Sequence, residues 1–139
     1  MAMGAVAQVV VHDLAQAQAA LAAAAEFGVR IELRSAPDAA AYAGVGYLQA
    51  LGELAGQELV VDCGDDPGLV MAALRTGCRK LAFAGSGELF QRLADMAAQA
   101  GAELEQGKRS PVLVLSPDDD TRARCLAWLS AGPSPRATP

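Results

Sequence analysis

The chain has 139 residues, of which 53% are hydrophobic and 19% charged, and alanine supplies much of the apolar content. This balance excludes an intrinsically disordered chain, and the length suits a domain with its own core. The net charge of −5 and the eleven dispersed Lys and Arg residues argue against nucleic acid or an anionic membrane surface as a partner.

Strands and helices are predicted to alternate along the chain. Strands are expected near 5–11, 29–34, 58–63, 79–84, 102–106 and 111–115, and helices near 14–27, 38–55, 67–76, 87–100 and 118–130. Four helical stretches end in a glycine that precedes a short apolar run; these are Gly28, Gly56, Gly77 and Gly101. Glycine adopts the left-handed conformation that ends helices, so the pattern predicts four helix-to-strand junctions.

Helix starts carry their own signals. Asp13 is predicted to cap the first helix, with Gln16 as its capping-box partner. Asp66 precedes Pro67, which is tolerated at the first helical position. Ser116 before Pro117 is expected to start the last helix in the same way. Ser86 or Gly85 is expected to start the helix near 87–100.

These elements predict a single α/β domain over residues 1–131, with a disordered tail at 132–139. The expected architecture is a three-layer, doubly wound and mostly parallel sheet of five to six strands, Rossmann-like or flavodoxin-like. A partial βα barrel is the alternative, because both folds use the same local units. Alternatively, the segments 102–106 and 111–115 pair with each other as two strands at the edge of the sheet.

The segment from Tyr42 to Leu48 places two glycines, Gly44 and Gly46, inside a predicted helix. Each interior glycine costs a helix about 1 kcal/mol relative to alanine. Two explanations stay open: the glycines allow close packing of a helix or a second subunit, or Ser35–Gly46 is a loop over a site.

Three cysteines without a C-x-x-C pair predict free thiols and a cytoplasmic protein. No apolar run is long enough to span a bilayer, and the first residues lack the basic region of a signal peptide. The dinucleotide fingerprint and the phosphate-binding P-loop are both missing, so no cofactor is predicted. No metal site is predicted either.

Ligands of parallel α/β sheets bind beyond the carboxyl ends of the strands. The catalytic candidates at this edge are His12, Asp62 and Cys63. The candidates for ligand binding are Asp65, Asp66, Gly85, Ser86 and Gly87. A lone histidine at neutral pH suits acid–base chemistry, a thiol suits nucleophilic attack, and glycine amides at a helix start suit a polar ligand.

Each candidate also has a purely structural explanation. Asp66 serves as a helix cap, Cys63 as a small buried residue, and the Gly85–Gly87 turn as a short connection to a helix. Acidic residues near Cys63 would keep it protonated, which disfavours the nucleophile.

No catalytic motif stands out, so two hypotheses remain. The first is a non-catalytic binding or assembly module that self-associates, most simply as a homodimer. The second is a small enzyme or small-ligand binder with its pocket at the carboxyl ends of the strands. The predicted partners are therefore a second copy of the chain and a small molecule.

Overall fold

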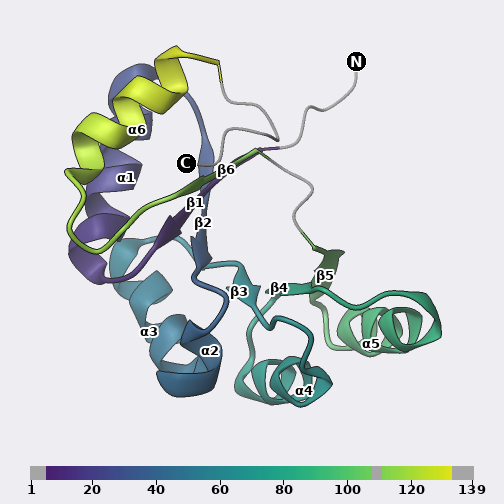
Figure 1. Ribbon diagram of the computed structural model, residues 1–139. Helices are drawn as coiled ribbons and strands as arrows, with labels where there is room; N and C mark the ends of the chain where they lie inside the picture. The colour runs from purple at the N-terminus through teal and green to yellow at the C-terminus, as the bar shows by residue number, and fades with distance from the viewer. Residues whose placement is uncertain (1–5, 108–110, 133–139) are drawn as a thin grey trace. The chain divides into compact units, whose positions relative to one another are not determined.

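A computed structural model describes residues 6–107 and 111–132 of the chain, and its described residues form a mixed α/β structure. The elements in order are β1 (Ala7–Val11), α1 (Leu14–Phe27), β2 (Ile31–Ser35), α2 (Ala39–Tyr42), α3 (Val45–Ala55), β3 (Val61–Asp62), α4 (Pro67–Thr76), β4 (Lys80–Phe83), α5 (Gly87–Gln99), β5 (Glu103–Gln106), β6 (Val112–Val114) and α6 (Thr121–Ser130) (Figure 1). The chain divides into two units, residues 1–34 with 109–139 and residues 35–108.

The first unit holds a sheet with the strand order β2-β1-β6, in which β1 and β6 run parallel with Val9 opposite Leu113. Helix α1 packs against α6. Its buried face is made of alanines such as Ala17 and Ala20, which have almost no exposed surface. These short side chains let the neighbouring helix approach closely.

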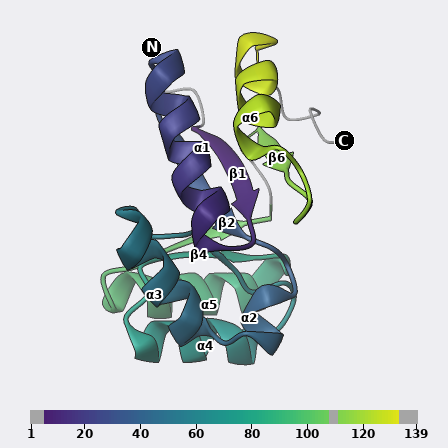
Figure 2. The same cartoon turned by 90° about the vertical axis from the view of Figure 1, so that its left-hand side faces the viewer.

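The second unit holds a parallel sheet with the order β3-β4-β5, in which Leu81 lies opposite Val61 and Leu104. Helix α4 packs between α3 and α5. The two views place α4 and α5 on the same face of this sheet (Figures 1 and 2). Strand β4 forms the centre of the core, and Leu81, Ala82 and Phe83 are each 1% exposed.

The predicted single sheet of five to six strands is wrong, because the strands form two three-stranded sheets. Strands β2, β1 and β6 pair with one another, and β3, β4 and β5 do the same. Within the second unit, Ser35 donates its backbone N–H to the Val60 carbonyl (3.0 Å), and its side-chain Oγ accepts the N–H of Asp62 (2.9 Å). The suggested edge pair is also wrong, since β5 pairs with β4 and β6 with β1.

The junction glycines are confirmed. Gly28, Gly56, Gly77 and Gly101 all have positive φ, between 77° and 97°. The predicted caps Asp13 and Asp66 are confirmed too: Asp13 accepts the N–H of Gln16 at 2.7 Å, and Asp66 that of Gly68 at 2.8 Å. In a capping box the Gln16 side chain would accept the backbone N–H of Asp13. It instead accepts the N–H of His12, the residue before the cap (2.8 Å).

Two helix predictions need correction. The helix expected at 38–55 is two helices, because Gly44 adopts a φ of 91° that interrupts the helical backbone. The last helix begins at Thr121, and its cap is Asp120, which accepts from Ala123 N–H (3.1 Å). Ser116 donates its backbone N–H to Asp119 instead (2.8 Å), so it belongs to the preceding turn.

No helix in residues 6–107 and 111–132 has the length and apolar character needed to cross a membrane. The prediction of one domain over 1–131 stays a prediction. Of the predicted tail at 132–139, residues 133–139 lie outside the described residues.

Candidate functional site

The carboxyl ends of β3 and β4 bring two predicted site segments together in the second unit. The loop 62–66 follows β3, and the turn at 84–86 leads from β4 into α5. Their backbones are joined by a hydrogen bond from Ala84 N–H to the Gly64 carbonyl (2.7 Å). The ligand-binding candidates Asp65, Asp66, Gly85, Ser86 and Gly87 therefore lie on neighbouring segments.

The carboxylates of this loop mostly serve the loop itself. Asp62 is 7% exposed and accepts the N–H of Gly64 (2.9 Å), while Asp66 caps α4. Asp65 is exposed. Within the described part of the chain, no group of three or more His, Cys, Asp and Glu side chains is arranged to hold a metal ion.

Cys63 belongs to this loop and is a free, buried thiol with 1% of its surface exposed. Burial raises its pKa to about 12, and the negative charges of Asp62, of an ionised Cys78 and of Asp66 add to the effect. The thiolate is the nucleophilic form of cysteine. At neutral pH the side chain therefore stays protonated, which fits a packing role for Cys63 better than a catalytic one.

The folded chain is expected to resist thiol reagents at pH 8. All three cysteines are buried, and burial also raises the pKa of Cys78 and brings that of Cys125 to about 11. A chromogenic disulfide reagent should count no fast thiol in the native chain and three in denaturant. Unfolded thiols ionise near their ordinary value of 9.0, so stability should fall as the pH rises above about 9. A single fast thiol mapped to Cys63 would restore it as a nucleophile.

His12, the third catalytic candidate, belongs to the first unit, whereas Asp62 and Cys63 belong to the second. It follows β1 and donates its backbone N–H to Gln16. Gln16 in turn donates to the Ser116 carbonyl (2.8 Å), which ties the ends of β1 and β6 together. The imidazole Nδ1 is buried, with no hydrogen-bond partner among the described residues. A catalytic role for His12 stays a prediction.

The Gly85–Gly87 turn has a structural reason for its first glycine. A Cβ at position 85 would lie 2.5 Å from Cε2 of the Phe83 ring. The Gly85 carbonyl also accepts from Gln106 Nε2 (3.2 Å). Ser86 precedes α5 without forming a side-chain cap, and Gly87 starts the helix at a φ of 69°.

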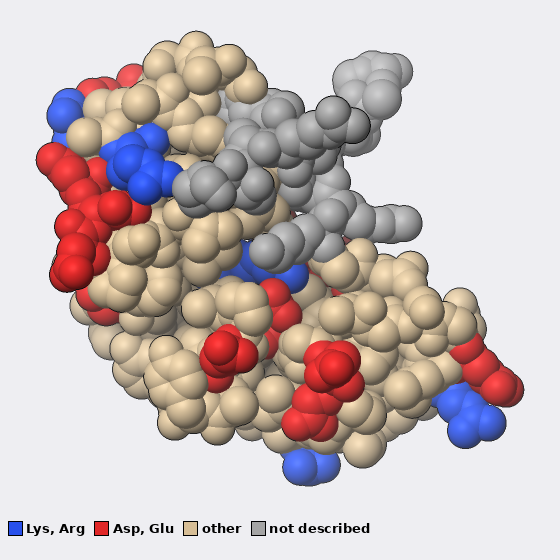
Figure 3. Space-filling model, viewed as in Figure 1, with Lys and Arg blue, Asp and Glu red and all other residues tan. Residues whose placement is uncertain are grey.

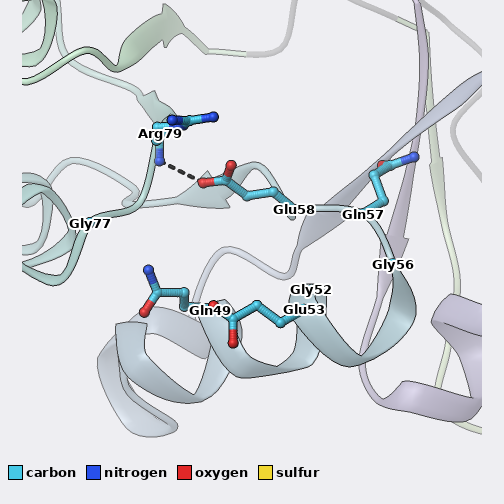
Figure 4. A pocket seen from close by; sticks show the side chains of 8 residues that line it. All are labelled: Gln49, Gly52, Glu53, Gly56, Gln57, Glu58, Gly77 and Arg79. Carbon is cyan, nitrogen blue, oxygen red and sulfur yellow. Dashed lines mark hydrogen bonds between the residues drawn. The ribbon is translucent and has the colours of Figure 1, made fainter.

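A cleft that the sequence does not predict lies at the other edge of this sheet, at the amino ends of β3 and β4 (Figure 4). Its volume is about 470 Å³, within the usual range of small-molecule pockets. The lining residues are Gln49, Gly52, Glu53, Gly56, Gln57, Glu58, Gly77 and Arg79. Two of the glycine junctions, at Gly56 and Gly77, meet here. That pairing was the available signal, but each glycine alone predicts only the end of a helix.

One side chain fixes the geometry of the cleft. Glu58 accepts the backbone N–H of Arg79 (2.6 Å), which joins the segment before β3 to the segment before β4. On the opposite wall, Gln49 Nε2 donates to the Thr76 carbonyl at the end of α4 (3.0 Å). The cleft is thus held by two polar bridges between consecutive βα units.

Comparisons with known proteins do not identify the chain. No protein-family model matches it, and no curated protein matches its sequence.

Proposed function

We propose that the chain is a small non-catalytic binding or assembly module that self-associates through the exposed side of α2 and α3. The observation that carries the proposal is a group of exposed apolar side chains there. Tyr42 is 76% exposed, Tyr47 48% and Leu54 70%. Together with the exposed Gly46 and Ala50 they form the α2–α3 face.

The charge of the chain favours a second copy as the partner on this face. Residues 39–52 contain no charged side chain, although the chain carries a net charge of −5. Figure 3 shows mostly uncharged surface over α2, whereas acidic and basic patches adjoin on α5. Two copies repel each other through their net charge, so they approach with least repulsion through an uncharged face.

The shape of the α2–α3 face also suits twofold pairing. Tyr47, Ala50 and Leu54 follow one another at i, i+3 and i+7 along α3, and Gly46 lies beside them. A twofold axis near Ala50 would set the bulky Tyr47 of one copy against the small residues of the other. Such an isologous contact needs one self-complementary surface, and tyrosine is enriched at the energetic centres of interfaces.

Sedimentation tests the proposal. At micromolar concentration the chain should have a mass near twice 14.2 kDa. Leu54→Glu should shift it to the monomer, because the new carboxylate would be buried against apolar side chains. Met96→Glu is the matched control, since Met96 is 41% exposed on α5 and should tolerate the same added charge. A monomeric parent chain, or equal effects of both variants, would contradict the proposal.

A second candidate is a small-ligand site at the carboxyl ends of β3 and β4. It is favoured by the hydrogen bond between Ala84 and Gly64, and by the start of α5, where no side chain caps the helix. In one version of this site, a divalent cation bridges an anionic ligand to the acidic loop. Titrating Mg²⁺ or Ca²⁺ while following amide resonances of residues 62–66 and 85–87 tests this metal-bridged version. If no amide resonance of either segment shifts at millimolar metal, the metal-bridged version is wrong.

The finer architecture and location are proposals too. A doubly wound, Rossmann-like layering fits the parallel strands and packed helices of each unit, and a partial βα barrel is the alternative. The three unpaired cysteines support a cytoplasmic location.

A further inference from the structure

The cleft between α3 and the segments before β3 and β4 is built mainly from backbone and polar side chains. Three of its lining residues are glycines, Gly52, Gly56 and Gly77. Gly52 lies so close to the segment after α3 that an added Cβ would be 2.9 Å from the Gln57 carbonyl oxygen. Within residues 6–107 and 111–132, no aromatic side chain lines the cleft. A ligand there would meet hydrogen-bonding groups as well as apolar surface.

The cleft offers hydrogen-bond acceptors in the carboxylates of Glu53 and Glu58 and donors in the guanidinium of Arg79. Figure 4 shows Glu53 and Glu58 on facing walls of the same space. Glu58 uses Oε2 for the Arg79 backbone N–H, so its second oxygen can still accept. The donor amide of Gln49 is already engaged by the Thr76 carbonyl.

The electrostatics of the cleft favour a cation. Two carboxylates line it against one guanidinium, that of Arg79. Helices α3 and α4 both end here, at Ala55 and Thr76, and the carboxyl end of a helix carries a partial negative charge. The negative charge of Glu58 adds to burial in raising the pKa of the neighbouring Cys78 thiol.

We infer that this cleft binds a small aliphatic amine cation, with one ammonium group between Glu53 and Glu58. An ammonium carries three donors and no acceptor, which suits the two carboxylates of the lining. The cleft volume of about 470 Å³ accommodates a short diamine whose second ammonium lies near the helix ends. This site is distinct from the α2–α3 face and does not depend on self-association.

Titration of the full chain with 1,4-diaminobutane at low ionic strength tests the inference. The amide resonances of Glu53, Glu58 and Gly77 should shift and saturate. Glu53→Gln and Glu58→Gln should each weaken binding about tenfold, because each removes a charge-assisted hydrogen bond. Glutamine at position 58 keeps an acceptor for the Arg79 N–H, and Glu53 is exposed, so both variants should fold.

Two controls separate a site from general attraction to an acidic chain. Glu88→Gln removes the same charge from the exposed start of α5 and should change the affinity less than twofold. The uncharged 1,4-butanediol should leave the resonances in place. The inference is overturned if Glu88→Gln weakens binding as much as Glu53→Gln, if butanediol binds equally well, or if the shifts map to another surface.

Discussion

Gly52→Ala should lower the free energy of unfolding by about 1–3 kcal/mol, the usual cost of forcing an extra carbon into a packed site. Alanine normally stabilises a helix interior by about 1 kcal/mol relative to glycine, so the expected sign is reversed here. The reason is backbone contact. The new Cβ would lie 2.9 Å from the Gln57 oxygen and 3.0 Å from the Glu58 Cα and the Leu59 nitrogen. Backbone atoms cannot rotate away as the end of a side chain can.

Gly46→Ala provides the matched control in the same helix. A Cβ at Gly46 meets nothing within 4 Å, and its φ is not positive. This variant should be neutral or more stable by up to about 1 kcal/mol. Urea unfolding, with both variants at the same low protein concentration, compares their free energies of unfolding. If Gly52→Ala is as stable as Gly46→Ala, the close approach of the chain after α3 is wrong.

Gly85→Ala is expected to cost about 1–3 kcal/mol as well, but against a side chain rather than backbone. The methyl group would lie 2.5 Å from Cε2 and 2.8 Å from Cζ of Phe83. The ring is 1% exposed in the core of the second unit, so it has little room to move. The ring must therefore shift, or the turn into α5 must open.

A double-mutant cycle isolates this contact. Phe83→Leu removes the two ring atoms that the methyl group meets, at its own cost in burial. The double variant should then be more stable than the sum of the single effects predicts, by about 1 kcal/mol or more. Additive effects, measured by urea unfolding, would show that Gly85 is not required by the Phe83 ring. Gly85 would then be free to serve a ligand.

Local structure was predictable from the sequence where a single residue decides it. Asp13 and Asp66 cap helices because their side chains reach amides two or three residues ahead. Gly28 and Gly77 end helices because only glycine readily takes their positive φ. Gly44 carries the same property, yet its flanking alanines and tyrosine continue the helical pattern, so the sequence left a continuous helix and a loop over Ser35–Gly46 both open.

Arrangements that depend on distant residues were not predictable. The sequence does not reveal which strands pair, and the structure holds two three-stranded sheets. The hydroxyl of Ser35 accepts the N–H of Asp62, 27 residues along the chain, and no local pattern predicts that bond. The cleft depends on Glu58 reaching Arg79 across 21 residues.

At the carboxyl edge the sequence indicated two segments of the second unit, which the structure joins by the hydrogen bond between Ala84 and Gly64. Burial of Cys63 and the internal bonding of Asp62 became visible only in the folded chain.

Disulfide formation at position 50 tests the proposed self-association most directly. Ala50 is exposed between Tyr47 and Leu54 on α3, and a disulfide requires Cα atoms within about 4–7 Å. Under mild oxidation most of the Ala50→Cys chain should become a covalent dimer, because a twofold axis near position 50 brings the two new thiols together. The native cysteines are buried and should not compete. Met96→Cys, exposed on α5, should stay mainly monomeric. Equal cross-linking of both variants, or none at position 50, would contradict assembly through the α2–α3 face.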